Sequence, residues 1–231
     1  MTNSTPARSA TRSVARRSRR VAWSGLTFVA LLLLSAGMAS VPGGSRSVAT
    51  VRDFYSAYAG TVAVAQLIGL AAATMFAVHA RALADVVSTG RSRLVQATGM
   101  IVAASAALTA VPVLALTAAI DRCSDRVVAG LAASSDYTDV LLFAAMSVFA
   151  VAVARALKLF WVGATAVSVA FLCTARSVLI ATGSTALDLA APLAFISLVA
   201  VVSIHRLVRR HAPSRSHCPD THQPNAGSRS K

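Results

Sequence analysis

Six stretches of about twenty mostly apolar residues follow one another along the chain, separated by short polar segments. A helix needs about 20 apolar residues to cross the hydrocarbon core of a bilayer, which is about 30 Å thick. Only 13% of the residues are charged and 56% are hydrophobic, whereas about 25% of an ordinary soluble domain is charged. The sequence therefore predicts an all-α polytopic transmembrane bundle of about six spans in a lipid bilayer, near residues 21–42, 56–79, 94–120, 138–157, 159–181 and 185–204.

The distribution of basic residues predicts the orientation of this bundle. With a cytoplasmic N-terminus, 17 of the 22 Lys and Arg residues fall in cytoplasmic segments, four fall in outer loops, and Arg176 lies inside a span. An excess of Lys and Arg marks the cytoplasmic side of a membrane protein. Both Trp residues fall at inner boundaries and the three Tyr residues, including Tyr55, at outer ones, as expected of amphipathic rings. We expect both termini in the cytoplasm (N-in/C-in).

Polar segments flank the spans. Residues 1–20 are rich in Ser, Thr and Arg, so we expect a disordered basic cytoplasmic tail. A six-helix transmembrane domain follows at 21–204, and a disordered, polybasic, His-containing cytoplasmic tail at 205–231. We expect anionic lipid to bind both basic tails. The Arg-rich start and the small residues near 36–40 also resemble a secretory signal, so a retained first span and a cleaved signal remain alternatives.

Arg176 and Asp188 are the charged residues expected well inside the hydrocarbon region. They flank the turn near Gly183 at similar distances, so their depths in a helical hairpin would differ by only about 3 Å. An ion pair that gates a path, binds a substrate or carries a proton is one interpretation, because intramembrane charges are costly. In the alternative, Asp188 caps the sixth span in a box begun by Thr185, and Arg176 extends to the lipid headgroups.

Two rows of small and weakly polar residues run along single helix faces. Gln66 lies in the row of the second span, and Ser105 and Thr109 lie in the row of the third. Such rows either pack helices closely together or line a polar path through the bundle, and we retain these residues as candidate binding or gating positions. The full rows are Ala59, Gln66, Gly69 and Ala73, and Thr98, Ser105, Thr109 and Pro112.

No motif for catalysis is present. The chain has no Glu and no Gly-x4-Gly-Lys-Ser/Thr phosphate loop. In the outer loop 121–126 each Asp has an Arg beside it, so we expect a self-neutralising loop and not a metal site. The tail also matches no zinc spacing with His205, His211, His217, Cys218 and His222. We expect no enzyme activity, no catalytic residue, no metal and no cofactor, and the net charge of +14 reflects topology and not nucleic-acid binding.

One segment resembles a known group of proteins. Residues 47–58, Ser-Val-Ala-Thr-Val-Arg-Asp-Phe-Tyr-Ser-Ala-Tyr, lead into Val-Ala-Gln-Leu-Ile-Gly-Leu-Ala-Ala at 64–72. This pattern is similar to uncharacterised multi-span membrane proteins of high-GC Gram-positive bacteria, in which a Phe-Tyr-containing outer segment precedes the second span. The resemblance implies a bacterial plasma-membrane location and no particular activity.

Three functional interpretations follow. The first is a transport-type protein, such as an export permease, an immunity protein or a small-molecule carrier subunit, which binds a separate ATPase through the cytoplasmic loop 80–93 or forms a homo-oligomer. The second is a membrane scaffold or regulatory subunit that transports nothing. The third is an enzyme acting on lipid, which the scarcity of acidic residues disfavours. We adopt the first as the working hypothesis.

Overall fold

The computed structural model describes residues 6–38, 47–87, 89–157, 159–182, 184 and 187–208. This part of the chain is helical and contains no strand. Each of its six helices is long and apolar enough to cross a membrane, which confirms the prediction of an all-α chain with six helices of this kind. The helices are α1 (Pro6–Met38), α2 (Val48–Ala84), α3 (Thr89–Ala119), α4 (Asp125–Ala156), α5 (Phe160–Ala181) and α6 (Ala190–Val208).

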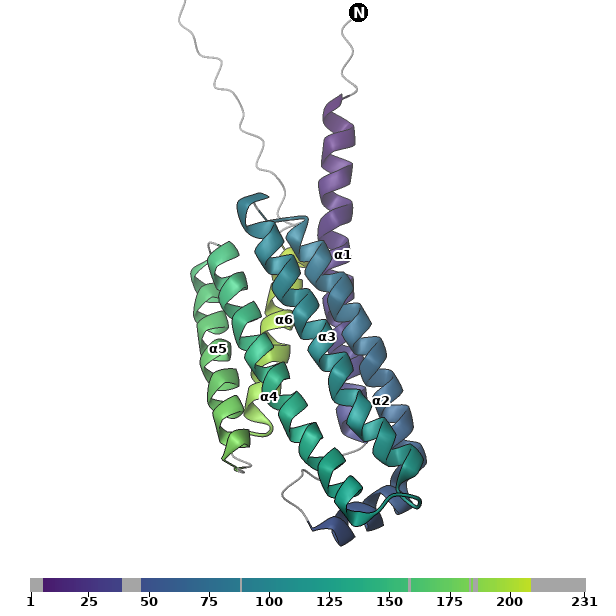
Figure 1. The fold of residues 1–231 in the computed structure, drawn as a ribbon. Helices are drawn as coiled ribbons and strands as arrows, with labels where there is room; N and C mark the ends of the chain where they lie inside the picture. Colours follow the sequence, from purple (N-terminus) through teal and green to yellow (C-terminus); the bar gives the residue numbers. More distant parts are fainter. Residues whose placement is uncertain are drawn as a thin grey trace, which may run out of the picture.

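Successive helices run in opposite directions along one bundle (Figure 1). As a result α1 begins and α6 ends at the same end, which we call the terminal end, and the α3–α4 and α5–α6 connections lie at the distal end. Large apolar side chains face outward from the bundle, among them Leu67, Phe171 and Trp161, which are 60%, 73% and 80% exposed. An outer surface of this kind is suited to lipid and not to water.

The helix lengths are unequal. With 37, 31 and 32 residues, α2, α3 and α4 are much longer than α5 and α6, which have 22 and 19. α2 is kinked at Tyr58, and its straight part after the kink, residues 59–84, is about 39 Å long at 1.5 Å per residue, which still exceeds the hydrocarbon thickness of about 30 Å. At the distal end α2, α3 and α4 extend past the α5–α6 connection (Figure 1). The segments 48–55 and 125–137, which the sequence places in outer loops, are therefore helical.

A small apolar cluster holds these distal helix ends together. Val51 and Tyr55 of α2 are buried against Val113 and Leu116 of α3 and Val128 of α4. Tyr55 is therefore not a ring at the membrane boundary, as its position in the sequence suggested, but an interior side chain that is 1% exposed. Its position depends on α2 and α4, which extend beyond their predicted spans and meet α3 there.

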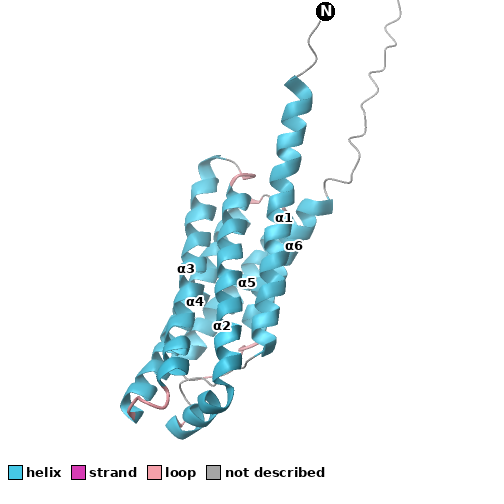
Figure 2. Ribbon diagram, turned by 90° about the vertical axis from the view of Figure 1, so that its right-hand side faces the viewer, coloured by secondary structure: helices cyan, strands magenta, loops and turns pink. Residues whose placement is uncertain are grey.

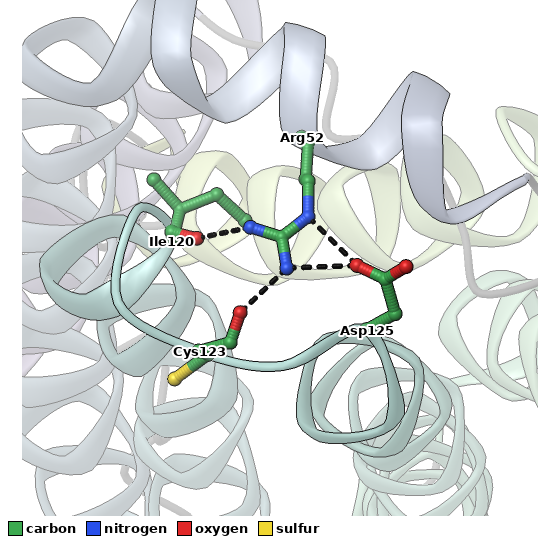
Figure 3. A network of polar contacts seen from close by, with 4 residues as sticks. All are labelled: Arg52, Ile120, Cys123 and Asp125. Carbon is green, nitrogen blue, oxygen red and sulfur yellow. Dashed lines mark hydrogen bonds and ion pairs between the residues drawn. The ribbon is translucent and has the colours of Figure 1, made fainter.

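Arg52 fastens the start of α2 to the α3–α4 connection (Figure 3). Its Nε and Nη2 donate to Asp125 Oδ1 at 3.1 and 2.9 Å, while Nη1 and Nη2 donate to the carbonyl oxygens of Ile120 and Cys123 at 2.5 Å each. The expectation that Asp125 pairs with its neighbouring Arg was wrong. A guanidinium presents several donors in one plane and can bind the carboxylate and the carbonyls together.

At the terminal end α1 projects beyond the other helices (Figures 1 and 2). It begins at Pro6, so most of the segment that we expected to be a disordered tail is helical. Ala and Arg, which recur through residues 7–20, are among the strongest helix formers, and Pro is favoured at a first helical position. At the other end of the chain α6 continues to Val208, so the start of the expected C-terminal tail is helical too.

Four phenylalanines from four helices form the centre of the main core. The ring of Phe76 in α2 lies 5.0 Å from that of Phe28 in α1, 5.2 Å from Phe149 in α4 and 5.6 Å from Phe195 in α6. All four rings are buried, with exposures of 0 to 5%. Tilted and edge-on ring pairs at these distances are favourable beyond simple area burial.

Small residues bring the helices close around this centre. A Cβ added to Gly99 of α3 would lie 2.3 Å from Ala80 Cβ of α2, and one added to Gly25 of α1 would lie 2.0 Å from Ser203 Oγ of α6. Neither distance is physically possible, so each glycine is needed for its helix to approach the neighbour. Close approach through small residues is the usual way in which helices pack in lipid.

We expect Phe76→Ala to destabilise the protein toward the lower end of the about 3–5 kcal/mol seen for Phe→Ala in soluble cores, because ring contacts to three helices are lost. Thermal unfolding of the detergent-solubilised protein measures this. Phe171→Ala is the matched control, since that side chain is 73% exposed. Equal losses in the two variants would contradict the central role of Phe76.

Candidate functional site

A cavity of about 200 Å³ lies between α1, α2, α3 and α4. Most of its wall is apolar, and hydroxyl and amide groups supply the remainder. No charged side chain contributes to it. The lining residues are Phe28, Leu32, Ser35, Gln66, Gly69, Ala72, Ala73, Phe76, Val102, Ala106, Thr109, Ala110, Leu142 and Met146.

The two small-residue rows identified in the sequence account for much of this wall. Gln66, Gly69 and Ala73 of the α2 row line the cavity, and Thr109 of the α3 row lies across from them. Ser105 is buried, at 5% exposure, but it does not line the cavity. Of the candidate positions in these rows, the structure thus brings Gln66 and Thr109 together and leaves Ser105 in the packing between helices.

The cavity has an aromatic end and a polar end. Phe28 and Phe76, which belong to the aromatic core, line it on the side of the terminal end. Ser35, Gln66 and Thr109 lie further along their helices toward the distal end. Phe28 and Ser35 are two helical turns apart on α1, a distance of about 10 Å. A molecule in this space would therefore meet rings at one end and hydrogen-bonding groups at the other.

The three polar side chains differ in what they can offer a ligand. Ser35 Oγ donates its proton to the Ala65 carbonyl at 2.8 Å, and Thr109 Oγ1 donates to the Ala106 carbonyl at 2.8 Å. Both hydroxyls are left as acceptors. Among the described residues the Gln66 amide has no hydrogen-bond partner. It can both donate and accept, so it is the most versatile polar group of the cavity wall.

The proposed ion pair between Arg176 of α5 and Asp188 is present in the structure. Arg176 Nη1 also donates to the Ser184 carbonyl at 2.7 Å, so its guanidinium closes the α5–α6 connection. The Arg176 side chain is 13% exposed and that of Asp188 is 45% exposed. This confirms the ion pair and not the alternative in which Arg176 extends away from Asp188. Whether the pair binds or gates anything stays a hypothesis.

The capping interpretation of Asp188 was wrong. It needs a helix that begins just after Thr185, but α6 begins at Ala190 and Asp188 lies in the turn before it. Thr185 itself is outside the described residues. Leu187 has a φ of 69°, in the left-handed region that branched side chains rarely adopt. In this turn the carboxylate of Asp188 pairs with Arg176 and does not cap the start of α6.

Sequence reasoning missed a third charge in this region. Asp139 of α4 interacts electrostatically with Arg176, with Asp188 and with Asp136. The next residues on each helix are in contact as well. Ser177 Oγ of α5 donates to the Val140 carbonyl of α4 at 3.4 Å. Asp139 lies one residue inside the predicted fourth span. Because it is so close to the predicted boundary, it was not identified as a charge within the bundle. Its relation to Arg176 depends on how α4 packs on α5.

The ion-pair region and the cavity are separate places on the same helix. Asp139 is near Arg176, while Leu142, one turn further along α4, lines the cavity. The structure therefore does not bring Arg176 and Asp188 together with Gln66 and Thr109. It places the charges on the distal side of the cavity.

A buried histidine was also not predicted from the sequence. His79 of α2 is 1% exposed, and its Nδ1 lies 3.0 Å from the Val21 carbonyl of α1. The carbonyl can only accept, so Nδ1 carries the proton in this contact. Because no His79 atom lines the cavity, we assign this residue to the packing of α1 on α2.

No group of three or more His, Cys, Asp or Glu side chains that could hold a metal ion occurs in the part of the chain that the structure describes. The tail residues His211, His217, Cys218 and His222 lie outside that part.

Double-mutant cycles are expected to show coupling between Arg176 and Asp188, because removing Asp188 leaves the charge of Arg176, which is only 13% exposed, without its partner. We expect a coupling free energy of about 1–3 kcal/mol from thermal unfolding of Arg176→Ala, Asp188→Ala and the double variant. The Arg52–Asp125 pair is the control. Asp125 is 78% exposed, so its coupling should be no more than about 1 kcal/mol. A coupling near zero at Arg176 would refute the ion pair as a stabilising contact.

Comparison with protein families, with characterised proteins and with solved structures found no match. The resemblance seen at residues 47–72 therefore stays an expectation, and function is argued from the geometry of the cavity and of the ion pair.

Proposed function

We propose that the chain is a multi-pass protein of a bacterial plasma membrane that carries a small molecule across the bilayer, with the cavity between α1, α2, α3 and α4 as its substrate site. The cavity itself is the main support. The α2 residues that line the cavity, from Gln66 to Phe76, bracket the middle of the straight part of α2 that follows the kink at Tyr58, so the cavity lies near the centre of this helix. Carriers commonly bind their substrates near the middle of the membrane, where access can alternate between the two sides.

Charge placement supports an orientation with both termini in the cytoplasm. Exposed arginines gather at the terminal end: Arg16, Arg17, Arg19, Arg20, Arg81, Arg91, Arg93 and Arg155. Basic residues are retained on the cytoplasmic side during insertion. They would also attract anionic lipid headgroups, each contributing about 1 kcal/mol. Lipid is accordingly the partner that we expect to contact most of the surface, through the apolar outer side chains and the arginines of the terminal end.

A separate ATPase as partner has less support than the sequence suggested. The expected docking loop 80–93 is mostly helix, and the connection between α2 and α3 spans only residues 85–88. Ala80, Leu83 and Ala84 are buried. The segment still exposes Arg81, Asp85, Arg91 and Arg93, so it is the shortness of the connection that leads us to favour a carrier, alone or as a homo-oligomer, over a subunit of an ATPase-driven exporter.

A scaffold or regulatory subunit is the second candidate. The compact packing around Phe76 and the fixed Arg52 network favour it, because both restrict motion of α2 against its neighbours. A carrier must open the cavity to each side in turn, whereas a scaffold need not. We do not propose an enzyme, since the hydroxyls of Ser35 and Thr109 in the cavity wall have no acidic or basic side chain beside them there to activate them.

Cysteine accessibility tests the transport proposal without knowledge of the substrate. In a protein whose native cysteines are replaced, Thr109→Cys should react with a small membrane-impermeant thiol reagent in intact cells and also in inside-out vesicles. The physical reason is that a carrier exposes its site to both sides in turn. A scaffold would show no reaction or reaction from one side only.

Two exposed glycines serve as controls for the sides. A Cβ at Gly90 or at Gly130 would meet no atom within 4 Å, so cysteine fits at both positions. We expect Gly90→Cys to react only in inside-out vesicles and Gly130→Cys only in intact cells. The reverse pattern would contradict the proposed orientation and would leave the result at Thr109 valid.

A further inference from the structure

We propose that the cavity selects a neutral molecule of about the size of one aromatic ring that carries a single hydrogen-bonding group. This inference deepens the proposed transport function and rests on it, since it assigns the class of substrate. Three properties of the cavity support this inference: its volume, the absence of charged side chains from its wall, and its division into an aromatic end and a polar end.

The volume limits the size of the ligand. An apolar cavity of about 150 Å³ holds benzene, so about 200 Å³ has room for about eight non-hydrogen atoms. A nucleotide, a peptide or a whole lipid would not fit inside this space and would have to protrude from it. The space admits one ring with a short substituent.

The chemistry of the wall excludes ions. None of the lining side chains is charged, and an ion that enters a mostly apolar space loses hydration without gaining a counter-ion. The charged side chains of Arg176, Asp188 and Asp139 all lie outside the cavity wall, on its distal side. A neutral ligand is therefore the class that this wall can stabilise.

The two ends of the cavity orient such a molecule. Its ring would lie against Phe28 and Phe76, whose faces and edges are suited to aromatic contact. Its polar group would lie between Ser35, Gln66 and Thr109. Because both hydroxyls already donate to backbone carbonyls, a ligand O–H or N–H finds acceptors there, and the Gln66 amide can return a hydrogen bond to the same ligand atom.

Phenol and toluene are suitable probes, because they have nearly the same shape and differ in the hydroxyl. The full chain in lipid nanodiscs is titrated with each by calorimetry, with empty nanodiscs as the blank. We expect one saturable site that prefers phenol. Gln66→Leu keeps the volume but removes the amide, so it should weaken phenol about tenfold and leave toluene unchanged. Thr109→Val should weaken phenol in the same direction.

The exposed Gln96 of α3 supplies the matched control: Gln96→Leu should bind both probes as the unaltered protein does. Absence of a saturable phenol site would overturn the inference, as would binding of benzoate as strong as that of phenol. An equal loss of phenol and toluene in Gln66→Leu would also overturn it, since that outcome indicates a purely structural glutamine.

The outcomes separate this inference from the transport proposal. Saturable phenol binding together with one-sided reaction of Thr109→Cys would support the ligand class and contradict transport. Two-sided reaction without phenol binding would support transport and contradict the ligand class.

Discussion

Phe76 contacts the rings of three phenylalanines from three other helices, and the arrangement of the bundle depends on this contact. It fixes α2 against α1, α4 and α6 at one depth. In lipid the helices gain little from leaving the solvent, which is itself apolar, so tight packing of shapes is what holds them together. A cluster of four interlocking rings supplies that packing at one level. At the same level Gly99 lets α3 approach α2 closely.

The cavity is a consequence of the same arrangement. Toward the terminal end the space between the helices is filled by rings. Further along α2 and α3 the facing residues are Gly69, Ala73, Ala106 and Ala110, whose side chains are too small to fill the separation that the rings impose. A void remains, and Ser35, Gln66 and Thr109 make its distal part polar. An unfilled space beside a tightly packed core loses contacts, and the substrate site proposed above would account for it.

The sequence predicted those features that depend on local patterns. The helices follow from apolar length, and the Arg176–Asp188 pair follows from two positions equally far from one turn. Features that depend on contacts between distant segments were missed. Arg52 pairs with Asp125 across 73 positions, and the proximity of Asp139 to Arg176 requires α4 to pack on α5. Gln66 and Thr109 were identified as polar positions on helix faces, but the sequence could not show that the two faces enclose a cavity.

The most direct test of this account is whether the space beside Ala106 is truly empty. Ala106 lines the cavity, whereas Ala103, about one turn earlier on α3, is 7% exposed in the packed core. We predict that Ala106→Leu leaves the thermal stability of the solubilised protein unchanged or raises it, because the larger side chain fills the void. Ala103→Leu should cost about 1–3 kcal/mol through overpacking. Equal destabilisation by the two substitutions would contradict the cavity, and with it the site on which the proposed function rests.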